Sequence, residues 1–220
     1  MRRLLRDNGL SITLFALFLI SLVGQALAGW RAQLEELHTH GQPAVGFLDY
    51  LTTGHFLSAT FENWESEFLQ MSVYVLLTVF LIQKGSSESK KPDEPNPEDE
   101  PPHLKRGDPN APWPVHRGGL ILKLYSHSLS IALVSLFLLS FWLHLAGSTR
   151  RLNEEAIQHG RPEQTIVETL ADAEFWYESF QNWQSEFLSI AVLVVLGIYL
   201  RERGSPESKP VAAPHELTGH

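Results

Sequence analysis

Two copies of one polar motif are the strongest candidates for chemistry in this sequence. The segment at 61–69, F-E-N-W-E-S-E-F-L, recurs at 180–188 as F-Q-N-W-Q-S-E-F-L, with seven of nine positions identical. Each copy places an asparagine and a glutamate four residues apart, which puts both side chains on one face of a helix. These residues are Asn63 and Glu67 in the first copy, and Asn182 and Glu186 in the second.

Two further polar residues are expected to meet these glutamates. Gln25 and His144 lie about one turn inside the ends of apolar runs, at the depth where Glu67 and Glu186 enter theirs. We expect Gln25 to contact Glu67 and His144 to contact Glu186, or each to contact the other copy's glutamate. A carboxylate beside apolar surface needs such a partner. The hypothetical ligand or proton site contains six residues: Gln25, Asn63, Glu67, His144, Asn182 and Glu186.

A structural role competes with that site. Glu67 and Glu186 could instead lie in the hydrated membrane interface and cap or pin helices, and we favour this interpretation over a pocket. Trp64 and Trp183 follow the two asparagines. Tryptophan prefers the headgroup layer of a bilayer, so both are expected to be interfacial anchors.

Other chemistries find little support in the residues. With no cysteine there is no thiolate metal site and no cysteine nucleophile. His38, His40 and His55 could bind zinc, but only His40 has a counterpart in the second copy. His127 and His144 lie on one helix, whereas haem ligation in a bundle uses facing helices. We therefore predict no catalytic residues, no enzyme activity, no metal and no cofactor. The net charge of −8 argues against nucleic acid as a partner.

Four apolar runs must position the motif residues. A membrane core of about 30 Å needs roughly 20 helical residues, and the first and third runs are long enough alone. The second and fourth are shorter, but aromatic residues precede each of them and can sit in the interface. The runs are Leu10–Gly29, Phe68–Ile82, Leu129–Gly147 and Phe187–Leu200. Short buried helices of a soluble protein are the alternative for the second and fourth runs.

The chain is an internal duplication. A shift of 119 residues aligns positions 1–91 with 120–210 without a gap, and 33 of the 91 pairs are identical. The duplication also bears on the N-terminus, which resembles a signal peptide ending at Ala26-Leu27-Ala28. The same segment recurs inside the chain at Leu129, so we expect a membrane helix there instead.

The sequence thus predicts an all-α membrane protein with four transmembrane helices, built as two tandem parallel two-helix repeats with an exported helical cap. We expect a first repeat at 1–91, a Pro-rich acidic linker at 92–119, a second repeat at 120–210 and a tail at 211–220. Eight of the 13 prolines lie within 92–114, which favours an extended, largely disordered linker.

Basic residues predict the orientation. The N-terminal tail, the linker and the C-terminal tail contain 3 + 7 + 3 = 13 of the 17 Lys and Arg residues, and the two outer loops contain the other four. Positive residues favour the cytoplasm, so both termini and the linker are expected there. The first helix of each copy should continue into the cap and stop at Gly41 and Gly160, each followed by a proline. Glycine is also expected to end the second helices, in G-S-S-E-S-K at Gly85 and G-S-P-E-S-K at Gly204, and a docking motif is the alternative interpretation of these repeats.

These motifs resemble those of a family of small bacterial membrane proteins classed as a domain of unknown function. The resemblance rests on N-W-x-S-E-F-L, the H-G-x-P turns, R-D-N-G-L at Arg6 and G-S-P-E-S-K-P-V at Gly204, and covers essentially the whole chain. It implies a location in the bacterial inner (cell) membrane and transfers neither an activity nor catalytic residues.

Two functions remain open. The preferred one is a non-catalytic membrane scaffold or accessory subunit that pairs with copies of itself or with another membrane protein. The alternative is a small transporter or permeation unit that uses an outer-leaflet polar site around Glu67 and Glu186. The lipid bilayer is a partner in both cases.

Overall fold

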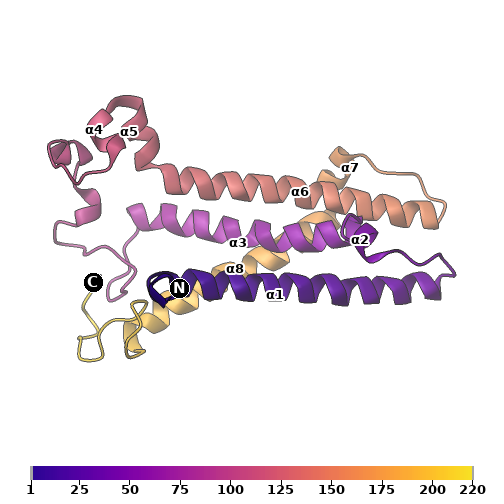
Figure 1. Cartoon of the computed structure of the whole chain (residues 1–220), viewed down its shortest axis with the longest axis horizontal. Coiled ribbons are helices and arrows are strands. Elements are labelled where there is room, and N and C mark those ends of the chain that lie inside the picture. Colours follow the sequence, from indigo (N-terminus) through magenta and orange to yellow (C-terminus); the bar gives the residue numbers. More distant parts are fainter. Residues whose placement is uncertain (1, 220) are drawn as a thin grey trace. The chain divides into compact units, whose positions relative to one another are not determined.

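The regular elements of this chain are helices. The computed structural model describes residues 2–219, with side chains from Leu5 onward, and no residue in that range is assigned to a strand. Figure 1 shows the four long helices, α1 (Arg2–Thr39), α3 (Gly54–Phe80), α6 (Ser128–Gln158) and α8 (Ala173–Tyr199). The shorter elements are α2 (Phe47–Tyr50), the 3-10 turns η1 (Pro97–Asp99) and η2 (Pro102–Lys105), α4 (Trp113–Arg117), α5 (Gly119–Ser126) and α7 (Ile166–Ala171). The predicted all-α class is confirmed.

Three long helices are long and apolar enough to cross a membrane, among the residues that the structure describes. They are Leu5–Thr39, Ser128–Gln158 and Ala173–Tyr199. The helix α3 is not among the three, because its apolar run is interrupted by polar side chains and the helix ends at Phe80, before Leu81 and Ile82. The interrupting residues are Gln70, Ser72, Tyr74 and Thr78. The fourth predicted span stays a prediction.

The distribution of polar and apolar side chains is the reverse of that in a soluble domain. Large apolar side chains are exposed along the long helices, with Leu10 at 76 % and Phe15 at 68 %. Many buried side chains in the described helices are small or polar instead, such as Ser58, Ser140 and Ser148. Apolar side chains can contact lipid acyl chains without a cost in solvation free energy, because the acyl chains are equally apolar. Small residues and residues with a hydroxyl group allow membrane helices to pack closely and to form hydrogen bonds with each other. The protein is therefore a membrane protein.

The chain folds into two compact units. The first comprises Met1–Phe61 and Leu143–Asp172, and the second comprises Glu62–Trp142 and Ala173–His220. Each unit takes segments from both sequence copies. The domain boundaries predicted at residues 91, 119 and 210 stay predictions.

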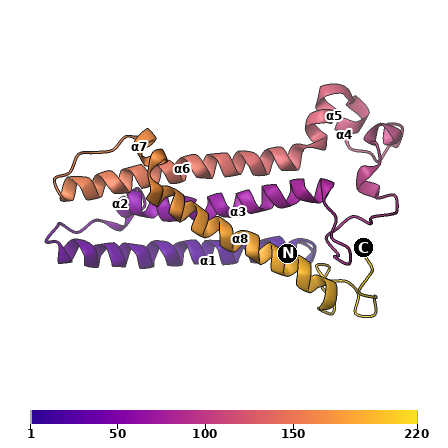
Figure 2. The ribbon, with the colours of Figure 1, turned by 180° about the vertical axis from the view of Figure 1, so that it is seen from behind.

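The first helix of each copy is broken at the same place. Asn8 interrupts α1 with φ −130° and ψ 18°. His127, which lies 119 residues later, separates α5 from α6 with φ −118° and ψ 12°. In both views α5 lies off the axis of α6 (Figures 1 and 2). A short element therefore precedes each first helix and can take its own direction.

The predicted helix stops at Gly41 and Gly160 are confirmed. The helices α1 and α6 end at Thr39 and Gln158, and the glycines have φ of 66° and 62°, the left-handed region that suits glycine. The N–H groups of Gln42 and Arg161 each donate over 2.8 Å to the carbonyl oxygen five residues earlier. Both stops are Schellman turns, which satisfy carbonyl groups left free at a helix end.

The segments that follow the stops at Gly41 and Gly160 each contain a short helix, α2 and α7. Thr165 caps α7 by accepting a hydrogen bond from the Glu168 N–H group, and the Glu168 side chain accepts one from the Thr165 N–H group in return. This reciprocal capping box satisfies two backbone donors. The hydrogen bonds from the Thr165 backbone and hydroxyl hold the pKa of Glu168 below its usual range.

The turns after α3 and α8 share one hydrogen-bond pattern, as the G-S-x-E-S-K motifs predict. Gly85 and Gly204 have φ of 87° and 89°. The hydroxyl oxygens of Ser89 and Ser208 each accept a hydrogen bond over 2.9 Å from the N–H group six residues earlier. The helices α3 and α8 end at Phe80 and Tyr199, five residues before these glycines, so the prediction that glycine ends the second helices is wrong. Each glycine lies instead in the turn that follows the helix, and a serine hydroxyl closes that turn.

The lysine that ends the second motif is enclosed by carbonyl groups. Lys209 is 1 % exposed, and its Nζ donates to the backbone oxygens of Gly85 (2.6 Å), His215 (2.8 Å) and Leu217 (3.1 Å). Burial lowers the pKa of Lys209, and repulsion from Arg201 lowers it further. These bonds fasten the C-terminal tail to the turn after α3, within the second unit.

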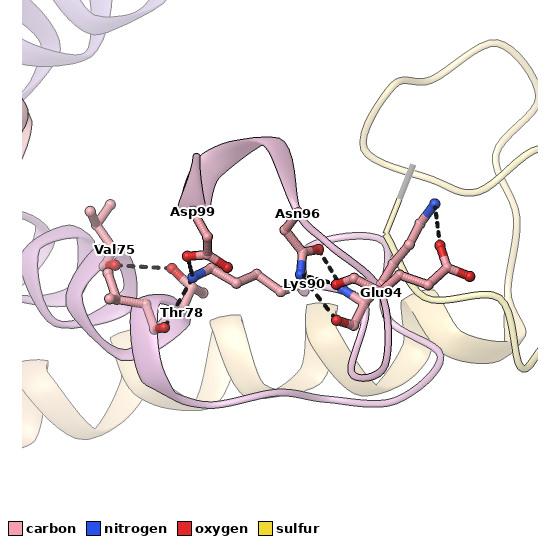
Figure 3. A network of polar contacts seen from close by, with 8 residues as sticks. Val75, Thr78, Lys90, Glu94, Asn96 and Asp99 are labelled. Atoms are coloured by element: carbon pink, nitrogen blue, oxygen red, sulfur yellow. Dashed lines mark hydrogen bonds and ion pairs between the residues drawn. The ribbon is translucent and has the colours of Figure 1, made fainter. Parts of the chain in front are cut away.

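The expectation that the linker is extended is wrong. The linker contains η1, η2 and α4, and a polar network orders its acidic part (Figure 3). Asn96 accepts from the Lys91 N–H group (2.9 Å) and donates to the carbonyl groups of Lys91 (3.1 Å) and Glu94 (3.0 Å), while Lys90 pairs with Asp99. Prolines begin both 3-10 turns, where the missing N–H group is not needed. The proline-rich composition therefore favours short turns here.

Candidate functional site

The helices α3 and α8 contact each other through polar groups in the second unit. The buried Gln70 side chain donates to the Glu186 carbonyl oxygen over 2.6 Å and to the Ser189 hydroxyl over 3.0 Å. Gln70 and Ser189 occupy equivalent positions, 119 residues apart. Equivalent positions meet where a twofold axis relates two copies.

The two motif glutamates interact electrostatically. The charge on Glu67 acts electrostatically on Glu186, and these two residues are also 119 apart. Glu67 is exposed and Glu186 is half-buried. Like charges repel each other, so a proton or a cation on either carboxylate would relieve the repulsion.

The motif asparagines differ in their surroundings. The Asn182 side chain donates to the Glu62 carboxylate and to the Glu178 carbonyl oxygen (3.3 Å). Asn63 is exposed, and its backbone carbonyl oxygen accepts a hydrogen bond from the Ser66 hydroxyl over 2.8 Å. The asparagine of the second copy therefore links two helices.

Sequence reasoning missed Glu62 and Glu65. Glu65 is fully buried, and the Trp183 indole Nε1 donates to its carboxylate over 2.9 Å. Both glutamates have a glutamine as counterpart in the second copy, Gln181 and Gln184. Glu67 was selected because the same residue occurs in both copies. The two carboxylates that contact the facing helix instead lie at positions where one copy has glutamate and the other has glutamine.

Trp183 is part of an aromatic cluster within the second unit. Its ring lies 5.2 Å from Phe180, 6.3 Å from Trp176 and 6.4 Å from Phe137, centroid to centroid. The remaining members are Phe141 and Phe175. Edge-to-face rings at these separations attract each other. Trp183 is half-buried and packs against these rings. Its role as an interfacial anchor stays a prediction.

Gln25 and His144, the other two predicted site residues, lie in the first unit. Gln25 is exposed and donates to the buried Thr60 hydroxyl over 3.2 Å. His144 is fully buried. The predicted contacts of Gln25 with Glu67 and of His144 with Glu186 stay predictions.

Close backbone approach joins α3 to α6 within the first unit. The hydroxyl groups of Ser58 and Ser148 hydrogen-bond over 2.8 Å. A Cβ atom added at Gly147 would lie 2.6 Å from the Ser58 backbone nitrogen, and one added at Gly54 would lie 2.1 Å from that of Arg151. Small residues at such crossings are typical of membrane helix pairs.

A small polar cleft of about 40 Å³ lies in the first unit, between α1, α3 and α6. His40 and His55, two of the three histidines considered for zinc, line it together with the cationic Arg151. The His40 Nδ1 donates to the Glu36 carbonyl oxygen over 2.9 Å, and the His55 Nδ1 bonds the Tyr50 hydroxyl over 3.2 Å. A volume of about 10–15 Å³ holds one water, so the cleft suits water or a small ion.

Comparison with known families gives one match. The family described as "Domain of unknown function (DUF6766)" matches residues 1–220. The chain belongs to this family. No curated protein and no solved structure matches it. The predicted resemblance to a family of unknown function is confirmed.

In this DUF6766 chain, the polar contacts chiefly join helices. Three side chains of α3 each form a hydrogen bond with a group on α8, those of Glu62, Glu65 and Gln70. Because the bilayer core contains no water, such bonds satisfy polar groups that would otherwise have no partner there. The Glu67–Glu186 pair is the exception, since the electrostatic interaction between these two carboxylates is repulsive.

Proposed function

We propose that this protein is a multi-pass bacterial inner-membrane protein that acts as a non-catalytic scaffold or accessory subunit. The main support is that three polar side chains of α3, those of Glu62, Glu65 and Gln70, bond groups on α8. Side chains engaged in this way stabilise helix association and leave fewer groups for substrate. A copy of the chain or another membrane protein is the proposed partner.

In this proposal α3 is the fourth span, and two tandem two-helix repeats insert in the same direction. Support comes from the 119-residue sequence repeat and from the matching breaks at Asn8 and His127. The excess of Lys and Arg in the tails and linker supports cytoplasmic termini and an exported cap. The α3 polar groups can enter the bilayer because they bond α8.

The proposed topology predicts a labelling pattern. Because the sequence contains no cysteine, Gln42→Cys and Asn96→Cys each introduce one thiol. We expect an impermeant maleimide to label position 42 but not position 96 in intact cells, and to label both after permeabilisation. Labelling of position 96 alone would reverse the orientation, and labelling of both in intact cells would contradict the proposal that α3 spans the membrane between them.

The alternative function, a small transporter or permeation unit, is favoured by the Glu67–Glu186 pair. Two repelling carboxylates are a suitable site for a proton or a cation. Four helices with few charged groups are a small framework for transport, so this function requires several copies around a shared path.

Ion flux separates the two functions. The purified protein is reconstituted into vesicles containing a pH-sensitive dye, and proton, sodium or potassium gradients are imposed. As a scaffold, the protein should dissipate each gradient at the rate of protein-free vesicles. A faster flux that the double variant Glu67→Gln/Glu186→Gln abolishes would replace the scaffold with the transporter. Gln33→Glu, in the cap, serves as the control for altered charge.

A further inference from the structure

The segment before α6 forms a small folded module, which we define as Pro102–Ser126. It consists of η2, α4 and α5, and α4 contacts both of the others. The His116 Nδ1 donates to the Arg106 carbonyl oxygen over 2.9 Å, and the Arg106 guanidinium packs against Gly118. The module therefore has its own structure and leads directly into the span that begins at Ser128.

The helix α5 is amphipathic. Its 100° steps place Leu120, Ile121, Leu124 and Tyr125 on one side and Lys123 and Ser126 on the other. Ile121 is half-buried, whereas Leu120 is 71 %, Leu124 53 % and Tyr125 46 % exposed. Within the module Leu104 and Trp113 are also more than 60 % exposed, at 63 % and 64 %. This exposed apolar surface requires a partner.

The module is basic, and the linker before it is acidic. Residues 102–126 contain four cations, Lys105, Arg106, Arg117 and Lys123, and one acid, Asp108, giving 4 − 1 = +3. Residues 88–101 contain six acids and two lysines, giving 2 − 6 = −4. The positive part adjoins the membrane span. Apolar side chains mixed with cations complement a surface of anionic headgroups above acyl chains.

The break at His127 allows the module to leave the axis of α6. A continuous helix would direct α5 straight away from the bilayer, but the non-helical His127 allows a turn between the two helices. Figures 1 and 2 show that α5 lies off the axis of α6. The N-terminal segment repeats this design in sequence, with Arg2, Arg3 and Arg6 and two leucines before the break at Asn8.

We propose that the module Pro102–Ser126 lies in the headgroup layer and binds anionic phospholipid, inserting Leu120, Leu124 and Tyr125. Chain continuity places these side chains beside the point where α6 enters the bilayer, and the four cations make lipid charge part of the binding. Only the choice of leaflet, the cytoplasmic one, rests on the proposed function.

The test uses the full-length protein in nanodiscs, which expose both membrane faces, so an error in the proposed topology does not affect the result. Leu124→Cys is labelled with an environment-sensitive fluorophore, and Asn96→Cys, in the acidic linker, is the matched control. In phosphatidylcholine discs containing about 30 % phosphatidylglycerol, position 124 should be blue-shifted and protected from acrylamide. Position 96 should remain exposed.

Charge variants test the role of the cations. Each of Lys105→Gln, Arg117→Gln and Lys123→Gln should lower the ratio of protected to exposed label by about fivefold, and the triple variant by about a hundredfold. Added salt should weaken protection of the parent protein, which gives a measurement independent of any folding defect in the variants.

Three outcomes would overturn the proposal. Equal protection in pure phosphatidylcholine would remove the role of anionic lipid. Protection of position 124 in detergent micelles without lipid would indicate a protein contact. Exposure of the label in every disc would show that the module stays in water.

Discussion

Replacing Gly147 with alanine is expected to lower the free energy of unfolding by about 3 kcal/mol, equivalent to a fall of roughly 6–12 °C in melting temperature. The added Cβ would lie 2.6 Å from the Ser58 nitrogen and 3.0 Å from the Leu57 carbonyl carbon. These are backbone atoms of α3, which cannot move aside as a flexible side chain can. Titration from dodecyl maltoside into sodium dodecyl sulfate measures the change.

The same substitution elsewhere provides a matched control. Gly24 in α1 and Gly197 in α8 also lie within apolar spans, and a Cβ at either would meet nothing within 4 Å. Alanine is a better helix former than glycine by about 1 kcal/mol, so Gly24→Ala and Gly197→Ala should be neutral or slightly stabilising. If Gly147→Ala behaves like these two, α3 and α6 do not approach as closely as the structure places them.

Local structure was predictable where a short motif determines it. The stops at Gly41 and Gly160 follow from glycine and proline at fixed offsets, and the turns at Gly85 and Gly204 follow from a repeated motif. In each case a few neighbouring residues satisfy the free backbone groups, so no distant contact is needed. The linker differs, because proline counts favour disorder while the turns depend on individual hydrogen bonds such as those of Asn96.

Contacts between helices were less predictable. Internal repetition identified the face that contains Gln70 and Glu186, but it also directed attention away from Glu65, whose counterpart is Gln184. Likewise Gly147 faces α3 although its counterpart is Ala28. A pseudo-symmetric contact brings together two non-identical surfaces, so groups that differ between copies can complement each other. Sequence identity between copies cannot reveal that complementarity.

Exposure also departed from expectation for part of the site. Gln25 and Glu67 are predicted to contact each other and Asn63 to belong to the same site, yet all three residues are exposed. Gln25 and Asn63 are uncharged, and the Gln25 side chain donates a hydrogen bond to the Thr60 hydroxyl. For Glu67, exposure fits the hydrated-interface role that competed with the pocket, since water can solvate its charge.

Loss of the Trp183 indole donor is expected to be the other large effect. Glu65 is fully buried and accepts the Trp183 N–H group over 2.9 Å, and a hydrogen bond to a charged group contributes about 1.5–3 kcal/mol. Trp183→Phe keeps an aromatic ring for Phe180 and Trp176 but removes the donor, so it should destabilise the protein by about 2–3 kcal/mol. Trp142→Phe, at a tryptophan that is 57 % exposed, controls for the smaller ring and should cost less than about 1 kcal/mol.

A double-mutant cycle assigns this loss to the charged acceptor. In a Glu65→Gln background the acceptor at position 65 is a neutral amide, so Trp183→Phe should cost only about 1 kcal/mol. The difference of about 1–2 kcal/mol between the two backgrounds is the coupling energy, and the same detergent titration measures all four proteins. An equal cost in both backgrounds would mean that Trp183 stabilises α8 through ring packing alone. The polar bonds between α3 and α8 would then lose one of the three contacts on which the scaffold proposal rests.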